Sequence, residues 1–328
     1  MRRAAQVVAF PFTLLAGLVL ALLAVPLMAL SAVGSLVADR TFRVPRALLF
    51  FDAYVGFDCM AIGSCAVIWA RRLRSRDTVA ATNQAYAVMT RLLDRLYRAA
   101  EVLLDLHTAV DGDAAAVAEV TASARPVIVL SRHSGPGDSF LVAHRLLCMG
   151  RRLRIVLRAA MRFEPVIGLL ATLLPLCFVR RGHSRSDATL ERITALAAGM
   201  DSSAALLLFP EGGNVSEERM RRGITALLRA GMRRRARQAA RLQHLAAPFP
   251  GGALAALHGA PHADVIFLAH SGLTPMDGVL WQRIPLHITL RMHLFLVAGD
   301  TIPESAGARS QWLFDWWQQL DAWIGAAA

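Results

Sequence analysis

Four short apolar runs set the limits on how this chain can fold. Each has the length and composition of a buried strand, and the segments between them are apolar or show helical spacing. Strands that alternate with helices predict an α/β domain with a mainly parallel sheet flanked by helices. The runs lie at 127–130, 154–157, 176–181 and 204–209.

Three of these runs end in residues suited to a functional site. In an open α/β sheet, ligands bind beyond the carboxyl ends of the strands. The sequence therefore predicts one site assembled from three strand ends. The residues are His133 and Asp138 after the first run, Arg180 and Arg181 in the third, and Glu211, Gly212 and Gly213 after the fourth.

His133 is separated from Asp138 by a turn that contains Gly135, Pro136 and Gly137. Because glycine tolerates positive φ and proline fixes its own φ, this turn is expected to be tight and rigid. A carboxylate held there can fix the imidazole tautomer and stabilise the imidazolium, so His133 is a candidate general base. A structural histidine beside an ordinary turn aspartate is the alternative, and for an isolated pair it is the more frequent one.

Glu211 follows the fourth run in a Pro-Glu-Gly-Gly turn. Because Gly212 and Gly213 have no Cβ, their backbone amides can approach a phosphate closely. Taken alone, such a segment is more often a simple turn. Together with the other strand ends, it favours a site that couples a base to a phosphate-binding region.

An ordered set of three motifs resembles the glycerolipid acyltransferases, the lysophosphatidate acyltransferase family. The motifs are His-x-x-x-x-Asp at 133–138, Phe-Val-x-Arg at 178–181 and Phe-Pro-Glu-Gly at 209–212. Pro175 stands where the second motif usually has glycine, and Gly213-Asn214 stand where the third usually has Thr-Arg. Residues 248–252 are the candidate for a loose fourth motif, and the resemblance covers about 125–270.

The resemblance implies a membrane-bound O-acyltransferase that moves an acyl chain from acyl-CoA to the hydroxyl of a lysophospholipid acceptor. The expected acceptor is 1-acyl-sn-glycerol 3-phosphate, which gives phosphatidate in phospholipid biosynthesis. His133 would be the base and Asp138 its orienting partner. No metal or organic cofactor is expected, because the thioester of acyl-CoA or acyl carrier protein is already activated. The substrate-binding candidates are Arg180 and Arg181 for the acceptor phosphate, with Glu211, Gly212, Gly213 and Phe178 elsewhere in the substrate site.

Two alternatives remain open at this stage. The acceptor can be a different one: another lysophospholipid, glycerol 3-phosphate or an acylated amino acid. The chain can also be a lipid-binding or scaffold protein that keeps the fold without the reaction. The presence of His133, Asp138 and Glu211 argues against the second alternative.

The N-terminal part predicts a membrane anchor. Residues 4–38 contain no charged side chain. As a helix, this stretch is more than long enough to cross a hydrocarbon core of about 30 Å. A second apolar segment at 47–70 contains Asp52 and Asp58, so it either returns across the bilayer or lies along its surface. The arginine cluster at 71–76 favours a cytoplasmic location for the remainder of the chain, at the inner cell membrane.

Composition supports the same picture. The chain is 55% hydrophobic and only 18% charged, and all 36 of its basic residues are arginines, for a net charge of +12. Such a charge attracts anionic lipid headgroups or phosphate-bearing substrates. No recognised nucleic-acid module accompanies it, so nucleic acid is not an expected partner. The four cysteines show no metal-binding or disulfide spacing.

These patterns divide the chain into an anchor at 1–76, an amphipathic helix and connection at 77–123, an acyltransferase domain at 124–300 and an aromatic helix at 301–328. The amphipathic helix is predicted over 78–108, and a helical, arginine-rich segment over 217–241. That segment is either a solvated face or a contact for headgroups or coenzyme A phosphates. The last helix is expected to pack on the domain or to insert at the membrane interface. The remaining histidines, His270 among them, are interpreted as structural or surface residues, and the oligomeric state stays open.

Overall fold

The computed structural model describes residues 17, 19, 22–23, 26–36, 42–110, 117–118, 120–121, 123–135, 137–180, 186–273 and 286–327. They fall into two compact units. The helical unit is drawn from 1–107, 160–174 and 276–288, and the sheet unit from 108–159, 175–275 and 289–328. Arg181, Pro136 and much of the uncharged stretch at 4–38 lie outside the described residues, so the roles expected for them stay predictions.

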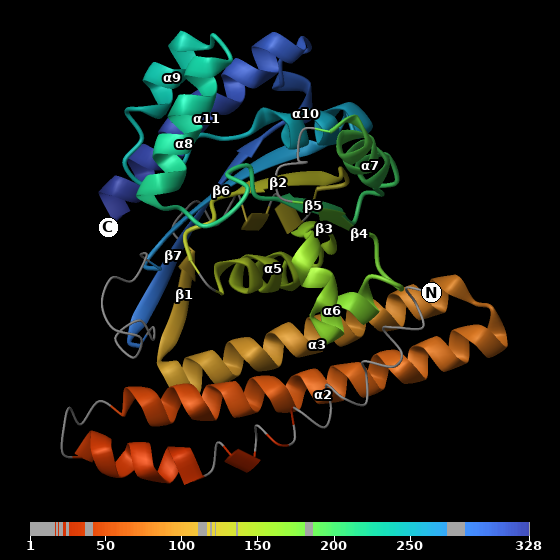
Figure 1. Ribbon diagram of the computed structural model, residues 1–328. Helices are drawn as coiled ribbons and strands as arrows, with labels where there is room; N and C mark the ends of the chain where they lie inside the picture. Colours follow the sequence, from red (N-terminus) through yellow and green to blue (C-terminus); the bar gives the residue numbers. More distant parts are fainter. Residues whose placement is uncertain are drawn as a thin grey trace. The chain divides into compact units, whose positions relative to one another are not determined.

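Seven strands form one sheet (Figure 1). They are β1 Leu106–Val110, β2 Val127–Ser131, β3 Arg152–Arg158, β4 Leu176–Val179, β5 Ala204–Leu208, β6 Asp264–Ser271 and β7 Ile288–Val297. Their order is β1-β7-β6-β2-β5-β3-β4. β2 pairs in parallel with β5 and β6, β3 pairs in parallel with β5 and β4, and β6 and β7 are antiparallel. The predicted α/β fold with a mainly parallel sheet is confirmed.

Helices cover both faces of the sheet. They are α5 Asp138–Cys148, α7 Asp187–Ala198, α8 Glu217–Arg229, α9 Arg233–Ala239, α10 Pro250–Gly259 and α11 Ala306–Ala327, with a short 3-10 helix at Gly299–Thr301. α5 lies on one face, and α7, α10 and α11 lie on the other (Figure 1).

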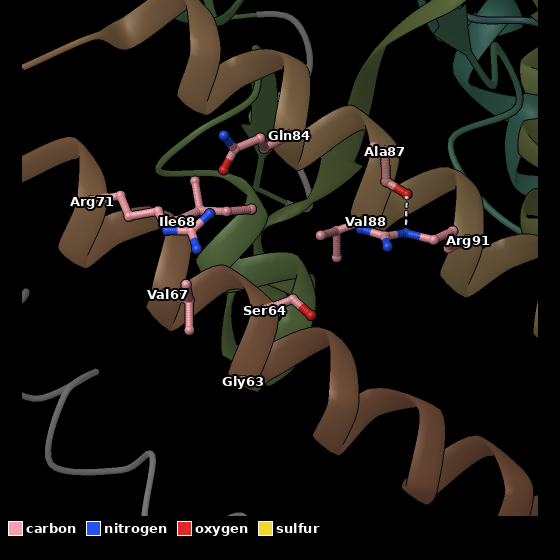
Figure 2. Close-up of a pocket in the computed structure, with 9 residues that line it drawn as sticks. All are labelled: Gly63, Ser64, Val67, Ile68, Arg71, Gln84, Ala87, Val88 and Arg91. Carbon is pink, nitrogen blue, oxygen red and sulfur yellow. Dashed lines mark hydrogen bonds between the residues drawn. The ribbon is translucent and has the colours of Figure 1, made fainter. Parts of the chain in front are cut away.

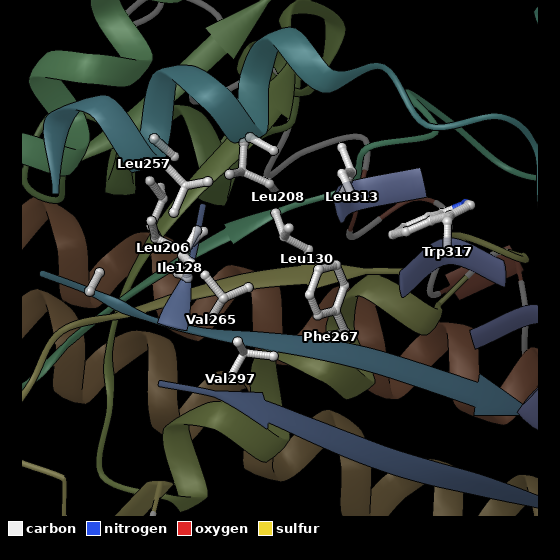
Figure 3. Close-up of a cluster of buried hydrophobic side chains, with 14 of the residues drawn as sticks. Ile128, Leu130, Leu206, Leu208, Leu257, Val265, Phe267, Val297, Leu313 and Trp317 are labelled. Carbon is white, nitrogen blue, oxygen red and sulfur yellow. The ribbon is translucent and has the colours of Figure 1, made fainter. Parts of the chain in front are cut away.

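The main core lies between the central strands and this second set of helices (Figure 3). β2, β5 and β6 are buried along their whole length, which explains why their sequences are almost continuously apolar. Alternate residues point to opposite faces, so Ile128 and Leu130 meet α10 and α11, whereas Val129 faces the α5 side. α11 contributes Trp317, which is completely buried. Packing on the domain is therefore the correct alternative for this helix.

Two predicted helices differ from those observed. The helix predicted over 78–108 ends at Leu104, and the following residues form β1. The segment 217–241 is two helices, α8 and α9, because Gly231 takes a φ of 73° between them. The first helix ends early because Asp105 takes a left-handed conformation with a φ of 50°, and the second is divided by the glycine.

The helical unit consists mainly of α2 Arg43–Ser75 and α3 Thr78–Leu104, joined by a short turn, with the small helix α6 Pro165–Leu170. A second short 3-10 helix, Ala159–Phe163, precedes α6. The Asp77 side chain accepts a hydrogen bond from the Ala80 N–H at 2.9 Å and so caps α3. The predicted apolar segment 47–70 lies inside α2 as one continuous helix.

Among the described residues, α2 is the helix with the length and composition to cross a membrane. It has 33 residues, and only 22% of its most apolar window is buried. At about 1.5 Å per residue it exceeds the thickness of a hydrocarbon core. An additional apolar helix at Pro26–Leu36 is too short for the same criterion. These features are consistent with association of the chain with a membrane.

Trp317 offers a test of the core. Its ring is fully buried, and its Nε1–H donates to the Ala246 carbonyl at 2.9 Å. We expect Trp317→Ala to lower the free energy of unfolding by about 3–5 kcal/mol, and Trp317→Phe by about 1–2 kcal/mol, because phenylalanine keeps the packing but not the hydrogen bond. Denaturant unfolding of the purified protein measures both. Equal losses for the two variants would contradict this assignment.

Candidate active site

The pairing of β2 with β5 places two predicted site residues at the same edge of the sheet. The two strands run in parallel with Leu130 opposite Leu208, so the chain leaves both at their carboxyl ends. His133 follows β2, and Glu211 follows β5. The His133 backbone N–H donates to Glu211 Oε1 at 3.0 Å, and the Val215 N–H donates back to the His133 carbonyl at 2.9 Å. The two turns are thus joined directly.

The His133 side chain is oriented by Asp138. Nδ1 lies 2.9 Å from Oδ1 and 3.0 Å from Oδ2 of the carboxylate, so an Nδ1–H tautomer donates to it. Nε2 makes no hydrogen bond within the described ranges and is left as the proton acceptor. The Phe209 ring packs against the imidazole with the ring centres 4.8 Å apart. His133 is 18% exposed, whereas Asp138 is fully buried, so a substrate can reach only the base.

The turn supplies Asp138 with further donors. Gly137, at a φ of 91°, starts α5, and Asp138 is its first residue. Its Oδ2 accepts the Ser134 N–H at 2.7 Å and the Gly135 N–H at 3.2 Å, and its Oδ1 accepts the Ser139 hydroxyl at 3.1 Å. Burial acts to raise the pKa of this carboxyl. The hydrogen bond from His133 and the neighbouring charges outweigh it, so the pKa lies below its usual value and Asp138 is ionised.

Glu211 is completely buried, and its carboxyl oxygens accept hydrogen bonds from backbone N–H groups. In addition to the His133 N–H, it accepts the Ala246 N–H on Oε2 at 2.9 Å. Burial raises the pKa of Glu211 to about 8, against the opposing effects of these two N–H groups and of Arg132. Glu211 therefore shapes the site and holds His133, and it has no surface through which it can touch a substrate.

Arg132 is a buried cation that the sequence analysis did not single out. Its guanidinium donates to the backbone carbonyls of His270 and His244. Burial lowers the pKa of Arg132, while the charges of Glu211 and Asp138 raise it. Its positive charge compensates the ionised Asp138 in a region of low dielectric, where an uncompensated charge is costly, and opposes the rise in the pKa of Glu211. Burial of this kind leaves no mark in the sequence.

His270 lies beside the same carboxylate. It is fully buried on β6, with Nε2 3.7 Å from Asp138 Oδ2. Burial lowers its pKa to about 4, which keeps the imidazole neutral. The interpretation of His270 as a structural residue agrees with its burial, but its position next to Asp138 was not foreseen.

A second group of cations gathers at Gly213. This glycine has a φ of 153°, and a Cβ there would overlap the guanidinium groups of Arg158 and Arg219. Arg219, from α8, donates to the Asn214 carbonyl at 3.0 Å and to the Glu211 carbonyl at 3.2 Å. Arg158 ends β3, is exposed, and makes no hydrogen bond or ion pair within the described ranges. The Gly212 N–H donates to the Phe209 carbonyl at 2.9 Å and closes the turn, so Gly213 is the glycine that faces these cations.

The structure does not bring every predicted residue into this group. Arg180 follows β4, the edge strand, and is separated from β5 by β3. Phe178 is buried within β4. Their roles in substrate binding stay predictions, as does that of Arg181. Arg158 could have been found by applying the strand-end rule to the second apolar run as well.

Within the part of the chain that is described, no group of three or more histidine, cysteine or acidic side chains is placed to hold a metal ion. All four cysteines are free thiols in the structure. The residues assembled here can accept a proton through His133 and bind an anion through arginines. Such a set of side chains is what a general-base site on an α/β fold requires.

A comparison with known protein families agrees with an enzyme site of this kind. Residues 115–250 match the family model Acyltransferase. The chain therefore carries an acyltransferase domain of the glycerolipid acyltransferase family, and the family predicted from the motifs is confirmed. No curated protein matches the chain.

The raised pKa of Glu211 predicts a pH dependence of stability. Folding lifts this pKa from 4.5 to about 8, so the folded chain binds more protons in that range and loses stability as pH rises through it. His270 acts in the opposite direction, but only between about 4 and its ordinary value of 6.5. We expect the thermal midpoint to fall from pH 6.5 to 8.

Two variants test whether Glu211 causes this fall in the thermal midpoint. Glu211→Gln should remove it, because glutamine does not titrate, although the midpoint itself drops with the loss of one accepted N–H. His270→Gln should leave the fall in place. Differential scanning fluorimetry at several pH values measures all three proteins. A parent protein with a flat midpoint over this range would show that Glu211 is already ionised.

Proposed function

We propose that this chain is an O-acyltransferase that transfers an acyl group from acyl-CoA to the hydroxyl of a lysophospholipid, with 1-acyl-sn-glycerol 3-phosphate as acceptor and phosphatidate as product. The acyltransferase domain supports the reaction class. The observation that carries the proposal is the imidazole of His133, held through Nδ1 by a buried, ionised Asp138 with Nε2 left for a substrate.

His133 acts as the base for the acceptor. Nε2 takes the proton of the acceptor hydroxyl as that oxygen bonds to the thioester carbonyl carbon. Asp138 stabilises the imidazolium that forms. When the tetrahedral intermediate collapses, the carbon–sulfur bond breaks and the imidazolium returns the proton to the departing thiolate. No covalent acyl-enzyme and no cofactor are required.

Arg158 is the residue we assign to the acceptor phosphate. It stands at the carboxyl end of β3, next to β5, and its guanidinium lies over Gly213 in the turn that holds Glu211. A guanidinium can hold a phosphate through two parallel hydrogen bonds. Arg219 reaches the same turn from α8 and supplies positive charge where the family's third motif has its own arginine. Arg180 and Arg181 remain candidates for an outer contact.

A membrane location suits this reaction, because the acyl chains of both substrates gain about 0.8 kcal/mol per CH₂ buried in a bilayer. α2 is the proposed anchor, at the inner cell membrane with the sheet unit facing the cytoplasm. The bilayer, the acyl thioester and the phosphate-bearing acceptor are then the partners of the chain.

Labelled acyl-CoA with a panel of acceptors tests the proposal. Transfer to lysophosphatidate in preference to glycerol 3-phosphate, other lysophospholipids or acylated amino acids is the expected result. Transfer only to another acceptor would contradict the proposed acceptor. Binding of lipid without turnover would favour the scaffold alternative.

The base itself is tested by substitution. We expect His133→Ala to lower kcat by at least about 10²-fold, within the range of general-base assistance, in a protein that is still folded. Asp138→Asn should also reduce kcat, because an amide does not stabilise the imidazolium as a carboxylate does. Residual turnover of His133→Ala close to that of the parent would rule out the role of base.

The phosphate contact is tested with a matched control. We expect Arg158→Ala to raise KM for lysophosphatidate about 10-fold or more, with a smaller effect on a phosphate-free acceptor such as monoacylglycerol. Arg229→Ala removes an exposed arginine from the end of α8 and should leave both KM values unchanged. Steady-state kinetics with the two acceptors measures this. Equal losses with both acceptors would assign Arg158 a structural role.

A further inference from the structure

The helical unit contains a groove between α2 and α3 with a volume of about 480 Å³ (Figure 2). Both walls belong to these two helices, far along the chain from His133 and Glu211. Its lining combines apolar and small residues with two arginines and two uncharged polar side chains. The residues are Gly63, Ser64, Val67, Ile68 and Arg71 from α2, and Gln84, Ala87, Val88 and Arg91 from α3.

Small residues create the groove. Gly63 has no side chain, and a Cβ built on it meets no atom within 4 Å. Ala87 on α3 is also small, so the two helices leave room between their outer edges. Ile68 and Val88 are buried and form an apolar floor. The groove is therefore a shallow, open one with an apolar floor.

The two arginines give the groove a positive charge. Arg71 and Arg91 extend toward one another from the two helices (Figure 2). The Arg91 Nε–H donates to the Ala87 carbonyl at 3.1 Å, which fixes the side chain against α3. The two terminal nitrogens of the guanidinium are then left to bind a ligand. Within the described ranges, neither guanidinium pairs with a carboxylate. The acidic residue next to Arg91 on α3 is Asp94, which forms an ion pair with Arg98 at 3.0 Å.

The surroundings indicate the kind of ligand. Met60, Val67 and Arg71 recur at helical spacing on one stripe of α2, and the first two are 47% and 51% exposed. This apolar stripe leads directly into the groove. At the other end, Arg71 opens the arginine cluster at 71–76, of the kind found where an apolar helix leaves a membrane. One end of the groove thus adjoins a basic segment, and an exposed apolar stripe leads to the other end.

We propose that this groove binds an anionic phospholipid, with the lipid phosphate between Arg71 and Arg91 and its acyl chains along Met60 and Val67. Guanidinium groups bind phosphate through paired charge-assisted hydrogen bonds, and neither Arg71 nor Arg91 forms an ion pair with a carboxylate among the described residues. The inference does not rest on acyl transfer, because it concerns a different pair of elements and is measured by binding alone.

The test uses the full-length protein in a non-ionic detergent. Native mass spectrometry follows the binding of dioctanoyl phosphatidylglycerol and, in parallel, dioctanoyl phosphatidylcholine. We expect the double variant Arg71→Gln, Arg91→Gln to weaken phosphatidylglycerol binding about 100-fold, at about tenfold for each lost contact, and to leave phosphatidylcholine unchanged.

Two further variants separate a site from general charge. Gly63→Leu fills the groove while keeping every arginine, and leucine suits a helix at this open position, so phosphatidylglycerol binding should fall about tenfold or more. Arg98→Gln removes an exposed α3 arginine that pairs with Asp94, and should change binding by less than about twofold. The proposal is overturned if the double variant or Gly63→Leu binds like the parent, or if Arg98→Gln loses as much as the double variant.

Discussion

The site depends on the hydrogen bonds by which two buried carboxylates hold one histidine. Glu211 accepts the backbone N–H of His133, and Asp138 accepts its ring N–H. Because one bond fixes the main chain and the other fixes the imidazole, the proposed base is held in place by the fold itself. This arrangement needs β2 and β5 to be neighbours in parallel register, so the sheet order itself is a requirement of the chemistry.

Burying two carboxylates is unfavourable unless the surrounding chain compensates them. One of these compensating hydrogen bonds comes from a stretch of backbone at 243–246, which other side chains hold in place. Arg132 donates to the His244 carbonyl, the Ala246 N–H donates to Glu211, and Asp321 of α11 accepts the N–H groups of Gln243 and His244. The last helix, which composition relates only to packing or to a membrane surface, therefore supports the base indirectly.

The sequence predicts the strands and the residues at their ends, because burial along a whole strand and a glycine-rich stop are both local signals. The strand ends and the order of the motifs singled out His133, Asp138 and Glu211, and the structure brings these three residues together. The order of strands is not local, however. β3 lies between β5 and the edge strand β4, which brings Arg158 rather than Arg180 over the Gly213 turn. The same limitation hid Arg132, because its burial results from neighbours distant in sequence.

The excess of arginine also has a different meaning once burial is known. Arg132 and Arg151 are buried and donate to backbone carbonyls inside the sheet unit, a task for which the five N–H donors of guanidinium are well suited. Their charge is committed to the fold. The arginines proposed here to bind anionic ligands have no carboxylate partner among the described residues; they are Arg158 in one unit and Arg71 and Arg91 in the other. A net charge of +12 therefore indicates binding only where burial and pairing leave a guanidinium available.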